Sequence, residues 1–169
     1  MQYCKNCLLP FRAVNLQINE KGQCSACDSH ERYLKIKDHE WTARKEKFKE
    51  IIIENKKNSN SDYDCIIPVS GGKDSYFQTH VVTKELGFKP LLVTYHGNNY
   101  LPEGDLNRDK MREVFNVDHL IFGPSIDTLK KLNRLCFKKM GDMNWHAHCG
   151  IFTYPFQIAV KFKIPTLIW

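Results

Sequence analysis

The loop Ser-Gly-Gly-Lys-Asp-Ser, residues 70–75, joins an apolar run to a helical pattern. At such a joint the backbone N–H groups converge where the helix dipole is positive, which makes an anion site. The glycines let a ligand approach the backbone closely. Lys73 adds a mobile positive charge, and Asp74, which would repel a phosphate, is expected to help hold Mg²⁺ between the anions. The residues assigned to this polyphosphate site are Ser70, Gly71, Gly72, Lys73, Asp74 and Ser75.

Two common nucleotide-binding patterns do not fit this loop. The Walker A pattern requires Ser or Thr after Gly72-Lys73, where this chain has Asp74, and a glycine at the position of Ile67. The G-x-G-x-x-G dinucleotide fingerprint is also absent from the loop. The alternative is an ordinary glycine turn with a surface lysine, but six matched positions between a strand and a helix favour the anion site.

Four cysteines near the N-terminus have metal-ligand spacing. Cys4 and Cys7 form one C-x-x-C pair, Cys24 and Cys27 form a second, and sixteen residues separate the pairs. This spacing is typical of a structural Zn²⁺ site with four thiolate ligands. Such a short segment cannot build its own hydrophobic core, so a metal would hold it folded. An iron–sulfur cluster and four free thiols remain as alternatives.

Length and composition limit the class of protein. A chain of 169 residues with 42% hydrophobic residues can form one core with a small appendage. The net charge of +6 suits a phosphate-bearing ligand, but the charges of residues 31–57 are mixed in sign, so a nucleic-acid partner is not expected. The sequence shows neither a membrane-spanning apolar run nor a signal-peptide core. We therefore expect a cytoplasmic protein, whose cysteines are thiols or metal ligands.

Apolar runs alternate with helical patterns through most of the chain. Because the runs are continuously apolar, they indicate a parallel sheet covered on both faces, the α/β doubly wound class. We predict a zinc knuckle at 1–29, a helical linker at 30–60 and, at 61–169, the α/β domain that carries the loop at 70–75. The predicted strands are 64–69, 90–95, 119–122 and 166–169; the predicted helices are 73–86, 105–115, 125–140 and 152–162, with one or two more across 31–57.

The loop at 70–75 resembles the pyrophosphate loop of the PP-loop, or adenine nucleotide alpha hydrolase-like, superfamily. The resemblance implies that ATP is cut between its α- and β-phosphates. A substrate oxygen would attack the α-phosphate, and a nitrogen or sulfur nucleophile would then displace AMP. The loop would hold the pyrophosphate, and Lys73 and Asp74 would be its catalytic residues.

A wider resemblance links the chain to the N-acetyl sugar amidotransferases of lipopolysaccharide and other surface-glycan pathways. It rests on the order of "YCKNCLLP", "GQCSAC", "WTARKEKFKEI", "YDCIIPVSGGKDSYFQ", "LGFKPLLVTY" and "KIPTLIW". It implies ATP, Mg²⁺ and Zn²⁺ as cofactors, an N-acetyl sugar as substrate, and a glutaminase subunit that supplies ammonia. The acetamido group would become an acetamidino group. Members of this family are longer, so we expect this chain to be a piece of a longer protein.

Other residues extend the predicted site. Thr94, Tyr95 and His96 end the second strand, where ligands lie in doubly wound sheets. We assign them to the adenosine, and the alternative is an ordinary loop. The residues assigned to an acceptor pocket, or else to a packed aromatic turn, are Trp145, His146, His148, Cys149 and Gly150.

The sequence also allows two alternative functions. Some PP-loop enzymes thiolate tRNA, but they use paired cysteines, and His146 stands where a partner of Cys149 would be. The other alternative is an inactive fragment that keeps the ATP and zinc sites.

Overall fold

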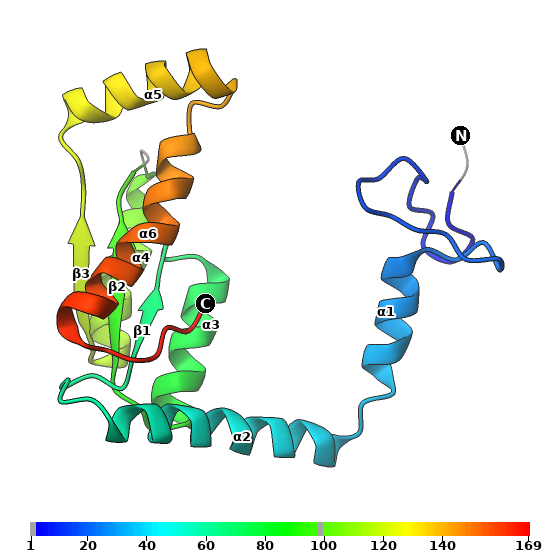
Figure 1. Ribbon diagram of the computed structural model, residues 1–169, viewed down its shortest axis with the longest axis horizontal. Coiled ribbons are helices and arrows are strands. Elements are labelled where there is room, and N and C mark those ends of the chain that lie inside the picture. Colours follow the sequence, from blue (N-terminus) through cyan, green and yellow to red (C-terminus); the bar gives the residue numbers. More distant parts are fainter. Residues whose placement is uncertain (1–2, 98–99) are drawn as a thin grey trace. The chain divides into compact units, whose positions relative to one another are not determined.

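The computed structural model describes residues 3–97 and 100–169 (Figure 1). The chain forms two compact units, Met1–Phe48 and Lys49–Trp169. The predicted boundaries after residues 29 and 60 stay predictions, and Met1 and Gln2 of the predicted knuckle lie outside the described residues.

The first unit consists of turns followed by helices. Its small core is made of three buried cysteines with Leu16 and Ile18 packed against them. Helix α1 (Ser25–Leu34) begins directly after Cys24, whose extended backbone ends the preceding segment. The helix therefore starts six residues before the predicted 31. Helix α2 (Asp38–Lys57) follows and runs across the boundary between the two units.

The second unit is built on a parallel sheet of three strands in the order β1-β2-β3. The strands are β1 (Cys65–Pro68), β2 (Pro90–Tyr95) and β3 (Asp118–Phe122). Ile66 pairs with Leu91 in the register of β1 and β2. These are the first three predicted strands, with slightly different ends.

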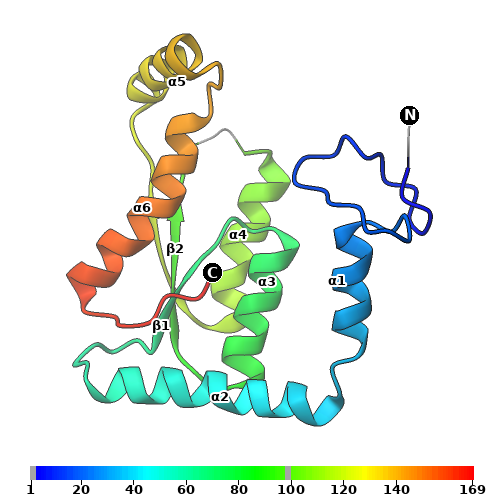
Figure 2. The ribbon, with the colours of Figure 1, turned by 45° about the vertical axis from the view of Figure 1, so that its right-hand side comes forward.

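Helices cover both faces of this sheet, as Figure 2 shows for α3 and α4 on one face and α6 on the other. Along β1, Cys65 and Ile67 pack toward Val82, Met111 and the α3–α4 side, while alternate residues pack toward α6. Burial on both faces explains why the strands are continuously apolar. The helices are α3 (Lys73–His80), its π-helical continuation η1 (Val81–Glu85), α4 (Pro102–Phe115), α5 (Ile126–Met140) and α6 (Trp145–Phe162).

The predicted helix at 73–86 is correct in extent but changes type. Its second part is η1, in which the Leu86 N–H donates to the Val81 carbonyl five residues earlier, at 2.9 Å. Ser125 caps the start of α5, because its Oγ accepts a hydrogen bond from the Thr128 N–H at 3.3 Å. Capping of this kind satisfies a backbone donor that the first turn leaves free.

Two predicted elements near the C-terminus are wrong in extent. The helix predicted at 152–162 begins at Trp145 and carries Pro155 in its interior. The strand predicted at 166–169 is reduced to a single parallel bridge between Ile66 and Leu167. Two hydrogen bonds hold it, from the Ile66 N–H to the Thr166 carbonyl at 2.8 Å and from the Ile168 N–H to the Ile66 carbonyl at 2.9 Å.

None of the helices in residues 3–97 and 100–169 has the length and apolar character that crossing a lipid bilayer requires.

Candidate functional site

The loop at 70–75 lies at the carboxyl end of β1 and leads into α3. Gly71 has a φ of +84°, a conformation that side chains disfavour. A Cβ at Gly71 would also lie 3.0–3.1 Å from the backbone of Arg108 on α4. The loop thus turns sharply against α4, and glycine is needed at this position for both reasons.

Several backbone donors of the loop have no acceptor in the helix. The first hydrogen bond of α3 runs from the Tyr76 N–H to the Gly72 carbonyl at 3.1 Å. The N–H groups of Lys73, Asp74 and Ser75 precede it, so they belong to the free donors of a helix start. This first turn is therefore suited to bind an anion, as the sequence predicts.

The loop borders a cavity of about 220 Å³ in the second unit. Its walls come from the ends of β1 and β2, the start of α3, Tyr100 before α4, and the middle of α6. The lining residues are Pro68, Val69, Ser70, Asp74, Ser75, Gln78, Val93, Tyr95, Tyr100, Ile151, Pro155 and Trp169. The predicted loop residues Ser70, Asp74 and Ser75 and the predicted adenosine residue Tyr95 share this cavity.

The charged residues of the loop lie on the surface. Lys73 Nζ is 2.6 Å from Asp74 Oδ1, and these side chains are 90% and 83% exposed. Such an exposed pair contributes little to stability, so both groups can move toward a ligand. Ser75, in contrast, is buried and donates from Oγ to the Gly72 carbonyl at 2.9 Å, which closes the turn.

Tyr95 is held in place by close packing against two glycines. A Cβ at Gly97 would lie 2.5 Å from Tyr95 Cε1, and a Cβ at Gly150 would overlap the same ring. Phe122 and Tyr154 flank the ring, with centroids 5.9 and 6.4 Å from its own. Burial raises the pKa of Tyr95, so its phenol stays protonated. It therefore presents a fixed aromatic wall to the cavity.

The neighbours of Tyr95 make internal contacts. Thr94 is buried, and its Oγ1 donates to the Val69 carbonyl at 2.5 Å. His96 Nδ1 lies 3.1 Å from Arg108 Nη1. Of the three residues predicted to flank adenosine, only Tyr95 is among the described residues that line the cavity.

The predicted acceptor residues lie on the first turns of α6, which begins before the predicted helix at 152–162. His146 is buried, and its Nε2 lies 2.5 Å from Asn133 Oδ1 on α5. Gly150 packs against Tyr95. Trp145, His148 and Cys149 are exposed. Among the described residues that line the cavity, α6 is represented instead by Ile151 and Pro155.

Pro155 gives the α6 wall of the cavity an unusual property. Proline has no N–H, so the carbonyl four residues earlier, that of Ile151, loses its helical donor. Both residues line the cavity. A backbone acceptor without its helical partner therefore lies in the wall formed by α6.

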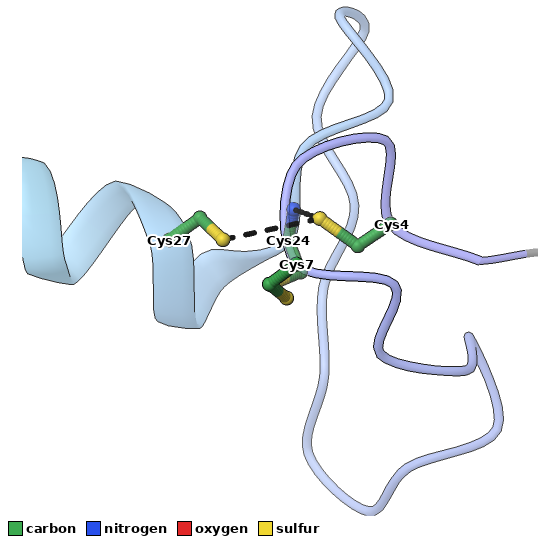
Figure 3. A group of neighbouring side chains, drawn as sticks. All are labelled: Cys4, Cys7, Cys24 and Cys27. Carbon is green, nitrogen blue, oxygen red and sulfur yellow. Dashed lines mark hydrogen bonds between the residues drawn. The ribbon is translucent and has the colours of Figure 1, made fainter.

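The four N-terminal cysteines converge on one point (Figure 3), with every sulfur within 4.8 Å of the other three. Cys4 Sγ is 3.9 Å from Cys27 Sγ, and Cys7 Sγ is 3.6 Å from Cys24 Sγ. Sulfurs around one tetrahedral Zn²⁺, with Zn–S near 2.3 Å, would be about 3.8 Å apart. The cluster thus fits a single metal ion better than an iron–sulfur cluster, whose thiolates bind different irons.

The backbone around Cys4 favours the thiolate. Its Sγ accepts from the N–H groups of Asn6 at 3.4 Å and Cys24 at 3.3 Å. The backbone N–H of Cys7 is the largest influence that lowers the pKa of Cys4, to about 6. Thiolates are the form that binds metals. The side chain of Cys7 has the opposite effect on Cys27 and raises its pKa to about 12, so a metal would have to displace that proton. The arrangement of the four sulfurs still suits one metal ion.

No protein-family model matches the sequence, and no curated protein matches it. Among solved structures, the chain is similar to an NH3-dependent NAD synthetase from Campylobacter jejuni, solved in complex with the nitrate ion. The two share a fold. The TM-score is 0.53 and the identity 14%, and the match covers 75% of this chain and 55% of the synthetase chain. This similarity confirms the predicted α/β fold class.

The sequence did not point to several residues around the cavity. Gln78 follows Asp74 by four positions, so helical spacing places both on one face of α3. No local pattern predicts Tyr100 or Trp169 as lining residues. Arg108 was not predicted either, because its position beside Gly71 depends on how α4 packs against the loop.

Proposed function

We propose that the second unit binds Mg-ATP, with the β- and γ-phosphates on the loop at 70–75. The observation that carries this proposal is the cavity at the carboxyl end of β1, which combines free N–H groups of the first turn of α3 with Ser70 and Asp74. Lys73 is free to turn toward the phosphates. Mg²⁺ held by Asp74 and phosphate oxygens would offset the charge that builds on the leaving pyrophosphate.

We further propose that the chain belongs to an N-acetyl sugar amidotransferase. The acetamido oxygen attacks the α-phosphorus of ATP, and pyrophosphate leaves. Ammonia then adds to the activated carbon, and AMP leaves with the original oxygen, giving an acetamidino group. The activation is needed because an amide carbonyl is a poor electrophile. A glutaminase subunit would supply the ammonia.

Two observations support nitrogen as the nucleophile. The similar fold is that of an NAD synthetase described as NH3-dependent. Cys149 is exposed on α6, whereas the other described cysteines are the four clustered ones and the buried Cys65 and Cys136. A relay that transfers sulfur would require two neighbouring cysteines. The exposed thiol of Cys149 is nevertheless the observation that favours tRNA thiolation as the second candidate function.

Turnover distinguishes the two functions. The assay measures AMP and pyrophosphate released from Mg-ATP, with nucleotide-linked N-acetyl sugars and ammonium chloride, or with tRNA and a sulfide donor. We expect release only with a sugar and ammonia, and the Cys149→Ser variant should keep most of it. Release only with tRNA, lost in that variant, would establish thiolation instead. Binding of Mg-ATP without turnover under either condition would identify a chain that binds nucleotide but does not react alone.

A further inference from the structure

Two consecutive hydrogen bonds connect β3 to β2, and β2 to the residue that precedes the loop. Thr94 Oγ1 on β2 donates to the carbonyl of Val69, which precedes the loop, at 2.5 Å. The same Oγ1 lies 2.8 Å from Nε2 of His119 on β3. A hydroxyl has one proton, and here the Val69 carbonyl receives it. His119 must therefore donate from Nε2, which fixes its tautomer.

The bond to Val69 determines the orientation of the first peptide of the loop. The peptide joining Val69 to Ser70 is planar and trans, so its N–H points opposite to its C=O. Thr94 holds this carbonyl toward β2, and the Val69 N–H is also held there by the Val93 carbonyl at 3.0 Å. The Ser70 N–H is consequently directed away from β2. Ser70 lines the cavity, so its N–H direction matters for a bound anion.

We propose that His119 and Thr94 are positioning residues of the phosphate loop, in which His119 orients the Thr94 hydroxyl and this hydroxyl orients the Val69–Ser70 peptide. The inference rests on the proposed function, since it assigns these residues to the binding of a nucleotide phosphate. Neither residue is among the described residues that line the cavity, so they act through the loop and not by contact with the ligand.

The surroundings of His119 keep its ring a neutral donor. Burial, and next the positive charge of Arg108 on α4, lower the pKa of His119 to about 4. Arg112 acts in the same direction, and Asp109 acts against it. A neutral imidazole lies beside these arginines without charge repulsion, whereas a protonated one would be repelled. His119 therefore stays uncharged at neutral pH and donates its single N–H to Thr94.

Matched substitutions test each bond. Thr94→Val keeps the shape and removes the hydroxyl, whereas Thr94→Ser keeps the hydroxyl. His119→Leu removes the donor, whereas His119→Gln can place an amide N–H near the position of Nε2. Thr83→Val is the control, because Thr83 Oγ1 also donates to a backbone carbonyl, that of Thr79, at 2.7 Å but away from the loop.

The measurements are Mg-ATP affinity by titration calorimetry and the amide NMR signal of Ser70, with circular dichroism to verify folding. Losing one hydrogen bond should weaken binding by roughly 5- to 10-fold in Thr94→Val and His119→Leu. The Ser and Gln variants should recover most of the affinity, and Thr83→Val should bind as the parent does. The Ser70 amide signal should shift only in the two disruptive variants.

The outcomes separate this inference from the proposed function. If the folded Thr94→Val and His119→Leu variants bind Mg-ATP as tightly as the parent and leave the Ser70 signal in place, the positioning role is wrong. If the parent itself fails to bind Mg-ATP, the proposed function is wrong, while the Ser70 signal still decides whether the two side chains orient the loop. If Gln and Ser fail to rescue well-folded variants, the effect is not due to the hydrogen bonds and the inference is overturned.

Discussion

Arg108 Nη1 on α4 lies 3.1 Å from Nδ1 of His96, the residue that follows β2. A guanidinium can only donate, so Nδ1 accepts and the His96 proton lies on Nε2. Arg108 also places Nη2 2.8 Å from Asp105 Oδ1 and its Cζ 5.2 Å from the ring centroid of Tyr100. Its backbone also lies 3.0–3.1 Å from where a Cβ on Gly71 would be, so one buried residue connects the phosphate loop, the end of β2 and a wall of the cavity.

Replacing Arg108 with Met should lower the free energy of unfolding by about 1–3 kcal/mol, because His96 and Asp105 lose their charged partner. Mg-ATP affinity should fall too, since Tyr100 loses the group packed on its ring. Urea unfolding and calorimetry measure the two effects. Lys110→Met removes an exposed charge from the same helix and should change neither. An Arg108→Met protein as stable as the parent would show that these contacts contribute nothing.

Lys73→Ala and Asp74→Ala should each weaken Mg-ATP binding by roughly 10- to 150-fold, equivalent to about 1.5–3 kcal/mol for a contact to a charged group. Folding stability should barely change, because both side chains are exposed. Lys84→Ala, a change of the same charge farther along the chain, is the control. Parent-like binding by both loop variants would remove the loop from the ATP site.

Elemental analysis should find about one zinc per chain, as expected for four thiolate ligands. A strong chelator should unfold the segment before α1, because three of the cysteines make up most of its buried core. NMR spectra before and after chelation measure this loss. Cys7→Ser should reduce the zinc content, whereas Cys149→Ser should leave it unchanged. A metal-free protein with the same N-terminal signals would contradict the metal site.

Two helical glycines should respond to alanine with opposite signs. Gly150→Ala would force a methyl group into the Tyr95 ring and should destabilise the protein by about 1–3 kcal/mol through overpacking. Gly104→Ala, on α4, meets only Tyr100 at an ordinary 3.6 Å and should stabilise it by about 0.5–1 kcal/mol. Thermal unfolding measures both. Equal effects of the two substitutions would mean that Tyr95 is not held by Gly150.

The stability of the second unit should fall as the pH is lowered from about 6.5 to about 4. The pKa of His119 is lowered to about 4 in the folded state, against an ordinary value near 6.5. Within this window the unfolded chain binds the extra proton, so stability rises with pH. Urea unfolding at several pH values measures the slope, which should be shallower in His119→Gln. Identical slopes for both proteins would show that His119 does not titrate differently on folding.

The features that the sequence predicted well depend on the spacing of residues that are close together in the chain. The four cysteines and the loop at 70–75 are contiguous patterns whose chemistry depends on near neighbours in the chain. Thr94, His119 and Arg108 acquire their roles from strand register and helix packing, which no window of sequence contains. Thr94 is the clearest case, because its place at the end of a strand suggested a ligand contact, whereas its hydroxyl serves Val69 and His119.

The start of α6 was missed for a different reason. Proline usually begins a helix or interrupts one, so a helix that runs straight through Pro155 is not expected from its sequence. In the structure, the helix runs through Pro155, which is itself buried, and continues back to Trp145. The buried apolar residues of α6 are Ala147, Pro155 and Ile158, and their packing favours a continuous helix although one helical hydrogen bond is lost. The predicted acceptor residues therefore lie on a helix that was expected to begin only after them.

The bridge at Leu167 also covers part of an exposed sheet edge. In the order β1-β2-β3, strand β1 is an edge, and an edge with free N–H and C=O groups is a template for intermolecular β-pairing. The segment 166–168 occupies both backbone groups of Ile66 on that edge. Loss of this short segment would leave the N–H and C=O groups of Ile66 unpaired and open to hydrogen bonding with another chain.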